Sequence, residues 1–498
     1  MAPTLRLVAL SAASALCAAA AQVSGSVPSG PWPTAPPFYP HYPSRNVTVM
    51  TGAWATGSYG GDVAAATYAD LAAGTPNQTS VPSCLDIAPA AIKGPRGTVF
   101  DRAAHACTPG ARALVRFYAV NFFARVFFDG VEQANHTAGP YTPFARVAPP
   151  CGAGGSREIA LMVNNEFNKT LSPTATGGDF YFYGGVIRPV VVTELPGAAY
   201  WLDHVEAPTA DVAAGLINVR VVLGGTAPAQ VELFLAFNGG APGAQRVAPV
   251  VQGVATLAGV AVPAGTKPWA LGQGNLFTLT VADAHTGDAL TVRSGLRVLG
   301  TAPGAGGGAR LTINGEVVKL KGYNRHVMWP DTGAAVTPAQ EAIDLATVKG
   351  VNANYIRGGH YPQSQSWLDL LDENGIAQWE EALGPGVSTA DIQNSVFMAA
   401  QVEAVTSMVT TSANHPSVIF HGFFNEGPSS DTKACPGYQT LADTVHALSS
   451  TSWRMVTWAS DKTTGDVCMA AADVVSYNSY PGWYDHPGNG ERARSVLA

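Results

Sequence analysis

A short apolar run near the carboxy-terminal end of the chain finishes on two polar residues. The segment HPSVIFHGFFNEG (415–427) has a strand-like centre, and Asn425 and Glu426 follow it directly. A carboxylate is costly to bury without a partner, so its place at the end of an apolar strand needs a chemical reason. A carboxyl group in this position could transfer a proton to or from a bound substrate.

Other strand-like runs after residue 301 also finish on polar side chains. They finish on His326, Arg357, His360, Glu380, Glu381, Asn478 and Tyr480. One such residue could cap a helix or form an ion pair, but capping does not explain the same ending on successive strands. Carboxylates beside Asn, His and Tyr, without the spacing of metal ligands, indicate glycoside hydrolysis by two carboxyl groups. The pattern predicts a carbohydrate site that needs no metal or cofactor.

The elements that carry these residues alternate between strands and helices across residues 301–498. This alternation predicts βαβ units, most simply a β/α barrel, whose functional residues lie at the carboxyl ends of the strands. Six strands can be counted in the sequence. A complete barrel of this kind has eight, so we expect a barrel that lacks its last two strands.

The part of the chain before the barrel is rich in strand signals. Residues 22–200 contain alternating runs such as ARALVRFYAV and a hairpin signal at Asp129-Gly130, which predict an all-β jelly-roll sandwich. Residues 201–300 contain four shorter strand candidates with the spacing of an immunoglobulin-like β-sandwich. The Gly-rich stretch at 301–308 marks the boundary to the barrel, assigned to residues 301–498.

The amino-terminal segment, residues 1–21, has the features of a secretory signal peptide. Arg6 precedes an apolar stretch and a cluster of alanines. A short membrane anchor is the alternative, but the run is shorter than the roughly 20 residues that a span needs. Acceptor sequences for N-glycosylation follow at Asn46, Asn77, Asn135 and Asn168. We therefore expect a secreted glycoprotein.

Six cysteines occur in the chain, and Cys17 belongs to the signal segment. An oxidising compartment permits disulfides. Proximity in the sequence favours the pairs Cys84–Cys107 and Cys435–Cys468 and leaves Cys151 unpaired. Unpaired buried thiols are the alternative.

Composition limits the classes of partner. The chain has 498 residues, of which 47 % are hydrophobic and 13 % charged, and its net charge is −7. No block of basic residues is present, so neither a nucleic acid nor an anionic membrane is an expected partner. Assembly into a homo-oligomer stays open.

Two segments resemble a known family. NYIRGGHYPQSQSWLDLLDENGI (354–376) and NHPSVIFHGFFNE (414–426) are similar to the signature segments of glycoside hydrolase family 2, the β-galactosidases, β-glucuronidases and β-mannosidases. KGYNRH (321–326), YNSYPGWY (477–484) and DFYFYGGVIRP (179–189) also look like segments of this family. The resemblance extends over almost the whole chain after the signal segment and follows the order of the three predicted domains.

The resemblance implies roles for particular residues. Glu426 would be the general acid/base, and Asn425 would donate a hydrogen bond to the sugar 2-hydroxyl. Asp179 would reach in from the first sandwich. The other residues implied to line the pocket are His326, Arg357, His360, Asn478, Tyr480 and Tyr484. The chain departs from the family pattern at Val327, Gly358, Gly359 and His421, which makes the choice of sugar harder to infer.

The partner carboxylate of Glu426 is the main departure. The resemblance places the nucleophile, a Glu, at the end of the seventh barrel strand, beyond Ala498. Glu380 and Glu381 belong to the third strand, beside Glu426, and Glu491 follows the sixth. The expected protein is a retaining exo-β-glycosidase for β-galactosides or β-glucuronides that is inactive as given. A secreted, non-catalytic carbohydrate-binding protein is the alternative.

Overall fold

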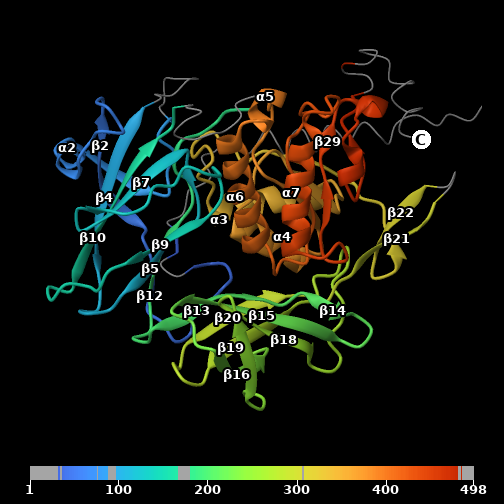
Figure 1. Cartoon of the computed structure of the whole chain (residues 1–498), viewed down its shortest axis with the longest axis horizontal. Coiled ribbons are helices and arrows are strands. Elements are labelled where there is room, and N and C mark those ends of the chain that lie inside the picture. Colours follow the sequence, from blue (N-terminus) through green and yellow to red (C-terminus); the bar gives the residue numbers. More distant parts are fainter. Residues whose placement is uncertain are drawn as a thin grey trace, which may run out of the picture.

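Three regions follow one another along the chain and pack side by side (Figure 1). The computed structural model describes residues 32–33, 36–75, 77–87, 97–166, 180–304, 308–480 and 484. The first β region is drawn in blue to teal, the second β region in green, and the helix-rich barrel region in orange to red. The segment expected to be a signal peptide, residues 1–21, lies outside the described residues.

The first β region consists of two antiparallel sheets that share one core. Their strand orders are β1-β12-β5-β9 and β3-β2-β4-β10-β7-β8. The strands are β1 (Val47–Val49), β2 (Gly52–Tyr59), β3 (Asn77–Val81), β4 (Thr98–Ala106), β5 (Ala113–Phe117), β7 (Phe123–Phe128), β8 (Val131–Glu132), β9 (Phe144–Ala148), β10 (Ser156–Asn164) and β12 (Val190–Glu194). A short pair, β6 (Val120–Asn121) and β11 (Gly185–Val186), and a helix, α2 (Tyr68–Ala72), complete the region. Val115 and Val192 from one sheet pack with Val126 and Leu161 from the other, as expected for the predicted sandwich.

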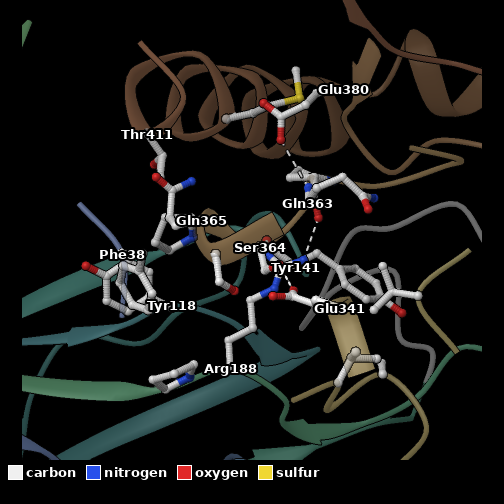
Figure 2. A pocket seen from close by; sticks show the side chains of 18 of the residues that line it. Phe38, Tyr118, Tyr141, Arg188, Glu341, Gln363, Ser364, Gln365, Glu380 and Thr411 are labelled. Carbon is white, nitrogen blue, oxygen red and sulfur yellow. Dashed lines mark hydrogen bonds between the residues drawn. The ribbon is translucent and has the colours of Figure 1, made fainter. Parts of the chain in front are cut away.

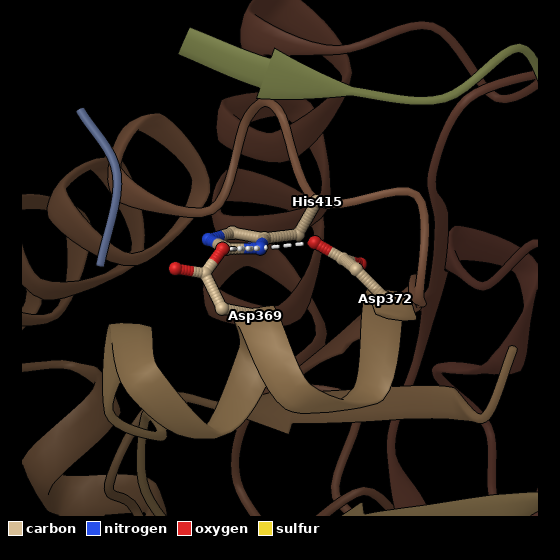
Figure 3. Close-up of side chains that lie close together, drawn as sticks. All are labelled: Asp369, Asp372 and His415. Carbon is tan, nitrogen blue, oxygen red and sulfur yellow. Dashed lines mark hydrogen bonds and ion pairs between the residues drawn. The ribbon is translucent and has the colours of Figure 1, made fainter. Parts of the chain in front are cut away.

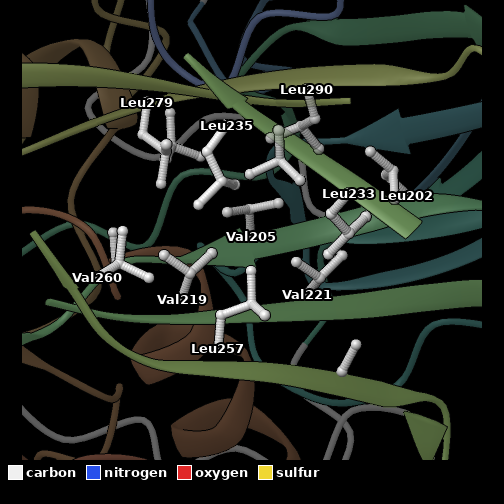
Figure 4. Close-up of a cluster of buried hydrophobic side chains, with 14 of the residues drawn as sticks. Leu202, Val205, Val219, Val221, Leu233, Leu235, Leu257, Val260, Leu279 and Leu290 are labelled. Atoms are coloured by element: carbon white, nitrogen blue, oxygen red, sulfur yellow. The ribbon is translucent and has the colours of Figure 1, made fainter. Parts of the chain in front are cut away.

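The second β region is one antiparallel sheet that folds over its own core. Its order is β13-β15-β18-β17-β16-β19-β20, with β14 paired to β15. The strands are β13 (Tyr200–Glu206), β14 (Thr209–Asp211), β15 (Leu216–Gly225), β16 (Gln230–Phe237), β17 (Arg246–Val251), β18 (Val254–Ala261), β19 (Phe277–Asp283) and β20 (Ala289–Ser294). Side chains alternate along β15, so that Ile217, Val219 and Val221 are buried. Figure 4 shows Val219 and Val221 near Leu233 and Leu235 of β16 in this core.

The barrel region follows a small antiparallel sheet of β21 (Leu299–Pro303), β22 (Ala309–Ile313) and β23 (Glu316–Val317). Its strands are β24 (Gly322–Arg325), β25 (Tyr355–Gly358), β26 (Ala377–Glu381), β27 (Val418–Gly422), β28 (Met455–Thr457), β29 (Ala459–Ser460) and β30 (Ser476–Tyr477). Its helices are α3 (Pro338–Gly350), α4 (Gln365–Asn374), α5 (Thr389–Ile392), α6 (Ser395–Thr411) and α7 (Cys435–Leu448), with short 3₁₀ turns η2 (Thr463–Gly465) and η3 (Met469–Ala471). Parallel pairing joins β24 through β28 in sequence order, and β29 pairs in parallel with β30.

This parallel order confirms the predicted strand–helix alternation. Helix boundaries follow local chemistry: Thr337 caps α3 with Pro338 as its first residue, and α4 ends at Gly375 in the left-handed conformation. β28 and β29 together correspond to one barrel strand. The described residues thus contain the six expected strands, and the absence of the last two stays a prediction.

Buried ion pairs surround helix α4, and the pair with Arg293 holds it against the second β region. Asp369 pairs with Arg293 of β20 at 2.8 Å, and Asp372 pairs with His415 Nδ1 at 2.6 Å. His415 Nε2 lies 3.1 Å from the Gln365 side-chain oxygen. Figure 3 shows both carboxylates rising from α4 toward the His415 ring. We call Arg293, Asp369, Asp372 and His415 the junction cluster, because it fixes the barrel on the second β region.

The disulfides correct one of the two predicted pairs. Cys435 and Cys468 are bonded, with their Cα atoms 4.9 Å apart, as predicted. The pair Cys84–Cys107 is wrong, because Cys107 is bonded to Cys151 and Cys84 is a free thiol. Cys107 follows β4 and Cys151 precedes β10, and these strands are antiparallel neighbours. Strand pairing therefore brings together two cysteines that are 44 residues apart.

None of the helices in the described part of the chain is both long enough and apolar enough to cross a bilayer.

Candidate active site

Glu426 lies on a turn with unusual backbone geometry at the end of β27. Phe424 and Glu426 both have φ of 52°, a conformation that costs a non-glycine residue about 1–3 kcal/mol. Packing and hydrogen bonding maintain this turn. Phe424 is fully buried among Phe397, Tyr438 and other apolar side chains, and the Glu426 amide donates to the Ala459 carbonyl of β29 at 2.9 Å.

The turn buries Asn425 and leaves Glu426 open to solvent. Asn425 is 8 % exposed, whereas Glu426 is exposed to solvent. Asn478, which follows β30, donates through Nδ2 to Glu426 Oε1 at 2.6 Å and to Asn425 Oδ1 at 3.2 Å. Glu426 is therefore an oriented carboxylate that a substrate can reach.

A buried ion pair lies beside Asn425. Arg357 of β25 contacts Glu381 Oε1 of β26 at 2.7 Å, and His360 Nδ1 lies 2.9 Å from Glu381 Oε2. Burial alone would raise the pKa of Glu381, but the Arg357 guanidinium and His360 outweigh it and lower that pKa. Glu381 is thus held as a carboxylate that anchors two predicted site residues.

Arg357 connects this ion pair to the Glu426 turn. Its Nη2 atom also donates to Asn425 Oδ1 at 2.7 Å. Because Arg357 and Asn478 are both donors, the Asn425 amide oxygen faces them, and its Nδ2 group is directed elsewhere. We call Arg357, His360, Glu381, Asn425, Glu426 and Asn478 the site cluster, which collects side chains from four barrel strands.

His326 reaches the same place from the end of β24. Its ring lies 5.3 Å from the His360 ring and 4.8 Å from Phe180 of the first β region. Asp179, predicted to enter the site from the first sandwich, lies outside the described residues. Its neighbour Phe180 also lies 5.8 Å from His360. The first β region therefore supplies part of the wall of the site.

Two predicted tyrosines lie farther along the chain after β30. Tyr480 and Tyr484 meet edge to face at 5.2 Å, and they are 39 % and 70 % exposed. The structure brings them to each other, and their contact with a sugar stays a prediction.

Glu380, which the sequence offers as a substitute nucleophile, faces away from the site cluster. Its neighbour Glu381 points toward Arg357, and successive strand residues point to opposite faces. Glu380 accepts from the Gln363 amide at 3.1 Å and lines a pocket between the first β region and the barrel helices, together with Tyr141 and Arg188 (Figure 2). Burial raises the pKa of Glu380.

Two departures from the family pattern lie away from the site, and packing explains the first. Val327 belongs to an apolar cluster with Phe182 and Tyr361, between the first β region and the barrel. His421 is fully buried and is next to Glu380 in the β26–β27 register, on the helix side of the sheet. Neither side chain contributes to the site cluster.

Comparison with protein families agrees with this geometry. Residues 307–497 match the model described as "Glycosyl hydrolases family 2, TIM barrel domain". The barrel region belongs to glycoside hydrolase family 2. This assignment confirms the resemblance carried by the two signature segments.

Curated relatives of this chain include two β-glucuronidases. That of Canis lupus familiaris is 25 % identical over 423 residues, covering 78 % of this chain and 62 % of the relative. That of Paenibacillus borealis is 26 % identical over 417 residues, covering 76 % and 66 %. The chain thus spans less than two thirds of the length of these relatives.

Solved structures share the fold of this chain. A β-galacturonidase from Eisenbergiella tayi has a TM-score of 0.78 at 23 % identity, covering 91 % of this chain and 78 % of the other. A β-glucuronidase from Bifidobacterium dentium has a TM-score of 0.79 at 23 % identity, covering 91 % and 81 %. These matches include the β regions that precede the barrel.

Glu381 is the site residue whose role the sequence did not reveal. The sequence offers it as a polar strand end and as a substitute nucleophile, whereas the structure uses it to hold Arg357 and His360. Its place at the end of a strand is visible in the sequence, but the direction of its side chain is not.

Proposed function

We propose that this chain carries the sugar-binding site and the acid/base residue of a retaining exo-β-glycosidase. The observation that carries the proposal is Glu426, an exposed carboxylate held by Asn478 at the carboxyl end of a barrel strand. A general acid must reach the leaving oxygen, and an exposed carboxyl group beside a buried polar floor satisfies that requirement. Glu426 would protonate the leaving group and later deprotonate the attacking water.

The proposed role of Asn425 follows from its partners. Arg357 and Asn478 occupy its amide oxygen. The Asn425 Nδ2 group can therefore donate to a sugar hydroxyl without losing another bond. Arg357 is in turn fixed by the buried Glu381 carboxylate. The ion pair thus acts as a rigid support for substrate orientation, which is a large source of rate enhancement.

We further propose that the nucleophile lies outside residues 1–498. A retaining pair needs carboxyl groups roughly 5–5.5 Å apart on opposite sides of the glycosidic bond. Among the described residues, Glu380 faces the helices, and Glu381 is engaged by Arg357 and His360. The chain by itself should then bind sugar without turning it over.

A β-glucuronide is the substrate class that the relatives favour. The curated relatives named above are β-glucuronidases, and one structural neighbour is named as a β-galacturonidase. A uronic acid at the non-reducing end is therefore the first candidate, and a β-galactoside is the second.

Secretion and glycosylation belong to the same proposal. The acceptor asparagines Asn46, Asn77 and Asn135 are exposed on the surface, where a glycosyltransferase can reach them. Asn168 lies outside the described residues. N-terminal sequencing of secreted protein should begin near Gln22, and retained Met1 would contradict the proposed signal peptide.

The test compares nitrophenyl β-glucuronide, β-galacturonide and β-galactoside as substrates. The purified 498-residue protein should give no turnover, and the product of a reading frame that continues past Ala498 should hydrolyse one of them. Glu426→Gln should then lower the rate about 10²–10⁴-fold. Hydrolysis by the 498-residue protein that Glu426→Gln abolishes would show that a carboxylate within the chain is the nucleophile.

A non-catalytic carbohydrate-binding protein is the second candidate. The buried Arg357–Asn425 floor, which could bind a sugar without the Glu426 carboxylate, favours it. Sugar binding that Glu426→Gln leaves unchanged, together with no turnover by any longer product, would establish this second function.

A further inference from the structure

We propose that Asp466 is a positioning residue for Glu426. It lies just after η2, on the loop that follows β29, and the family resemblance assigned it no role. The inference rests on the proposed acid/base role of Glu426. It concerns how a strained turn is held in one place, and it follows from three hydrogen bonds to one carboxylate.

Asp466 joins the segments on both sides of Glu426. Its Oδ2 atom accepts from Ser429 Oγ at 2.5 Å and from Trp458 Nε1 at 3.1 Å. Ser429 is three residues after Glu426. Trp458 directly precedes Ala459, whose carbonyl receives the Glu426 amide at 2.9 Å. One carboxylate thus links the two parts of the backbone that determine where Glu426 lies.

The loop that carries Asp466 is itself attached at two points. The Cys468 amide donates to Asp466 Oδ1 at 2.9 Å, and the disulfide joins Cys468 to Cys435 at the start of α7. The Val467 amide donates to the Ser429 carbonyl at 2.9 Å. The carboxylate therefore has a fixed support.

The turn needs such a support because its backbone is strained. Left-handed φ at Phe424 and Glu426 is maintained only where the surroundings over-determine it. The Phe424 ring provides this support on the buried side of the turn, because it packs in the cluster that contains Phe423 and Trp458. On the loop side, hydrogen bonds to an ionised acceptor are about twice as strong as neutral ones. Asp466 is the acceptor that supplies them.

The test uses two variants and one control. Asp466→Asn keeps the size of the side chain but replaces one acceptor oxygen by an NH2 donor. Ser429 and Trp458 share Oδ2 and the Cys468 amide uses Oδ1, so the variant cannot keep all three hydrogen bonds. Ser429→Ala removes one contact and leaves the charge. Asp443→Asn removes an equal charge from an exposed side chain that bonds Gln439 within α7. The readouts are amide hydrogen exchange of residues 423–430 in the 498-residue protein, and kcat and KM in an active longer product.

The expected result is faster exchange at Glu426 and Gly427, by about tenfold, in Asp466→Asn, with a smaller change in Ser429→Ala and none in Asp443→Asn. In the active product, Asp466→Asn should lower kcat about 10²-fold with little change in KM, because a displaced general acid fails mainly in the transition state. The same substitution should cost nothing further in a Glu426→Gln background.

Unchanged exchange over residues 423–430 would overturn the proposal, as would an undiminished loss of kcat in the Glu426→Gln background. Failure of the proposed function would differ, because Glu426→Gln itself would then leave kcat unchanged while the exchange experiment still reported on the turn.

Discussion

The site cluster and the junction cluster are built from the same residue types, but only one of them reaches solvent. Each contains an arginine, a histidine and at least one buried carboxylate. In the junction cluster, the Asp372 oxygens are bound by His415 and the Ser417 amide, and the Asp369 oxygens by Arg293 and the Tyr39 amide. In the site cluster, the contacts end at Glu426, which is exposed. Residue type alone therefore does not mark a functional site.

The pKa shifts of the central groups in the two clusters have opposite signs. Arg357 and His360 lower the pKa of Glu381 despite its burial. Burial alone would lower the pKa of His415, but the neighbouring Asp372 carboxylate raises it overall. In each cluster the neighbouring charges favour the ionised form of the central group. In the site cluster this group is a carboxylate that orients Arg357 and His360, and in the junction cluster it is a histidine held by two carboxylates of α4.

The largest expected effect comes from removing the arginine of each cluster. Arg357→Met leaves Glu381 buried without its guanidinium and should lower the free energy of unfolding by about 3–5 kcal/mol. Arg293→Met is the matched change in the junction cluster. Urea denaturation measures both, and calorimetry with glucuronate should detect weaker binding only in Arg357→Met. Equal loss of binding in the two variants would contradict the distinction between the clusters.

The two disulfides provide the next test. Replacing Cys435 and Cys468 together by serine should cost about 2–4 kcal/mol of stability, and so should the same change at Cys107 and Cys151. Only the first pair supports the loop beneath Glu426, because Cys468 donates to Asp466. Thermal unfolding should fall in both double variants, whereas glucuronate binding should weaken only in the first. Weaker binding in the Cys107/Cys151 variant would contradict this assignment.

A milder change removes one charge from the junction cluster alone. Asp372→Asn keeps the shape of the side chain but removes the charge opposite His415, and should cost about 1–3 kcal/mol. Glucuronate affinity should stay within twofold of the parent, since Asp372 contacts His415 and Ser417 and no member of the site cluster. A loss of affinity would show that the junction cluster is coupled to the site.

The smallest expected effect is on the pH dependence of stability. The pKa of Glu381 is lowered from 4.5, so its contribution is present above that pH and is lost as pH falls through the lowered value. The pKa of His415 is raised from 6.5, so its contribution is present below that pH and is lost as pH rises through the raised value.

Urea midpoints across pH should therefore flatten on the acid side in Glu381→Gln and on the alkaline side in His415→Gln. Burial also raises the pKa of Asp369 above 3.8, so its ionisation costs stability as pH rises from 3.8 through the raised value. This change opposes the contribution of Glu381 on the acid side, so each variant is compared with the parent. Flattening on the same side in both variants would contradict the opposite signs.

The strand-end pattern predicted much of the site because parallel strands bring their carboxyl ends to one edge. Arg357, His360, Asn425, Glu426 and Asn478 meet as that rule requires. A side chain's direction, by contrast, depends on pairing register. Periodicity could not show that Glu381 faces Arg357 while Glu380 faces the helices.

Long-range partners were the other limit of the sequence. Cys107 and Cys151 are joined because β4 and β10 are neighbours, and proximity in the sequence favoured Cys84 instead. Asp466 likewise lies on a loop whose contacts depend on the turn after β27. No local sequence pattern indicates either of these contacts, because both depend on how segments far apart in the sequence pack together.

The position of Phe180 means that the first β region and the barrel are not independent modules. The Phe180 ring lies against His326 and His360, so the first β region and the barrel together form the wall of the candidate site. Excising the barrel as an independent module would remove that wall and expose His326 to water. Combining this barrel with the first sandwich of a relative would give the pocket a wall that does not match the barrel. If the proposed function is correct, sugar preference can change through a substitution in a segment far from Glu426 in the sequence, without any substitution in the barrel itself.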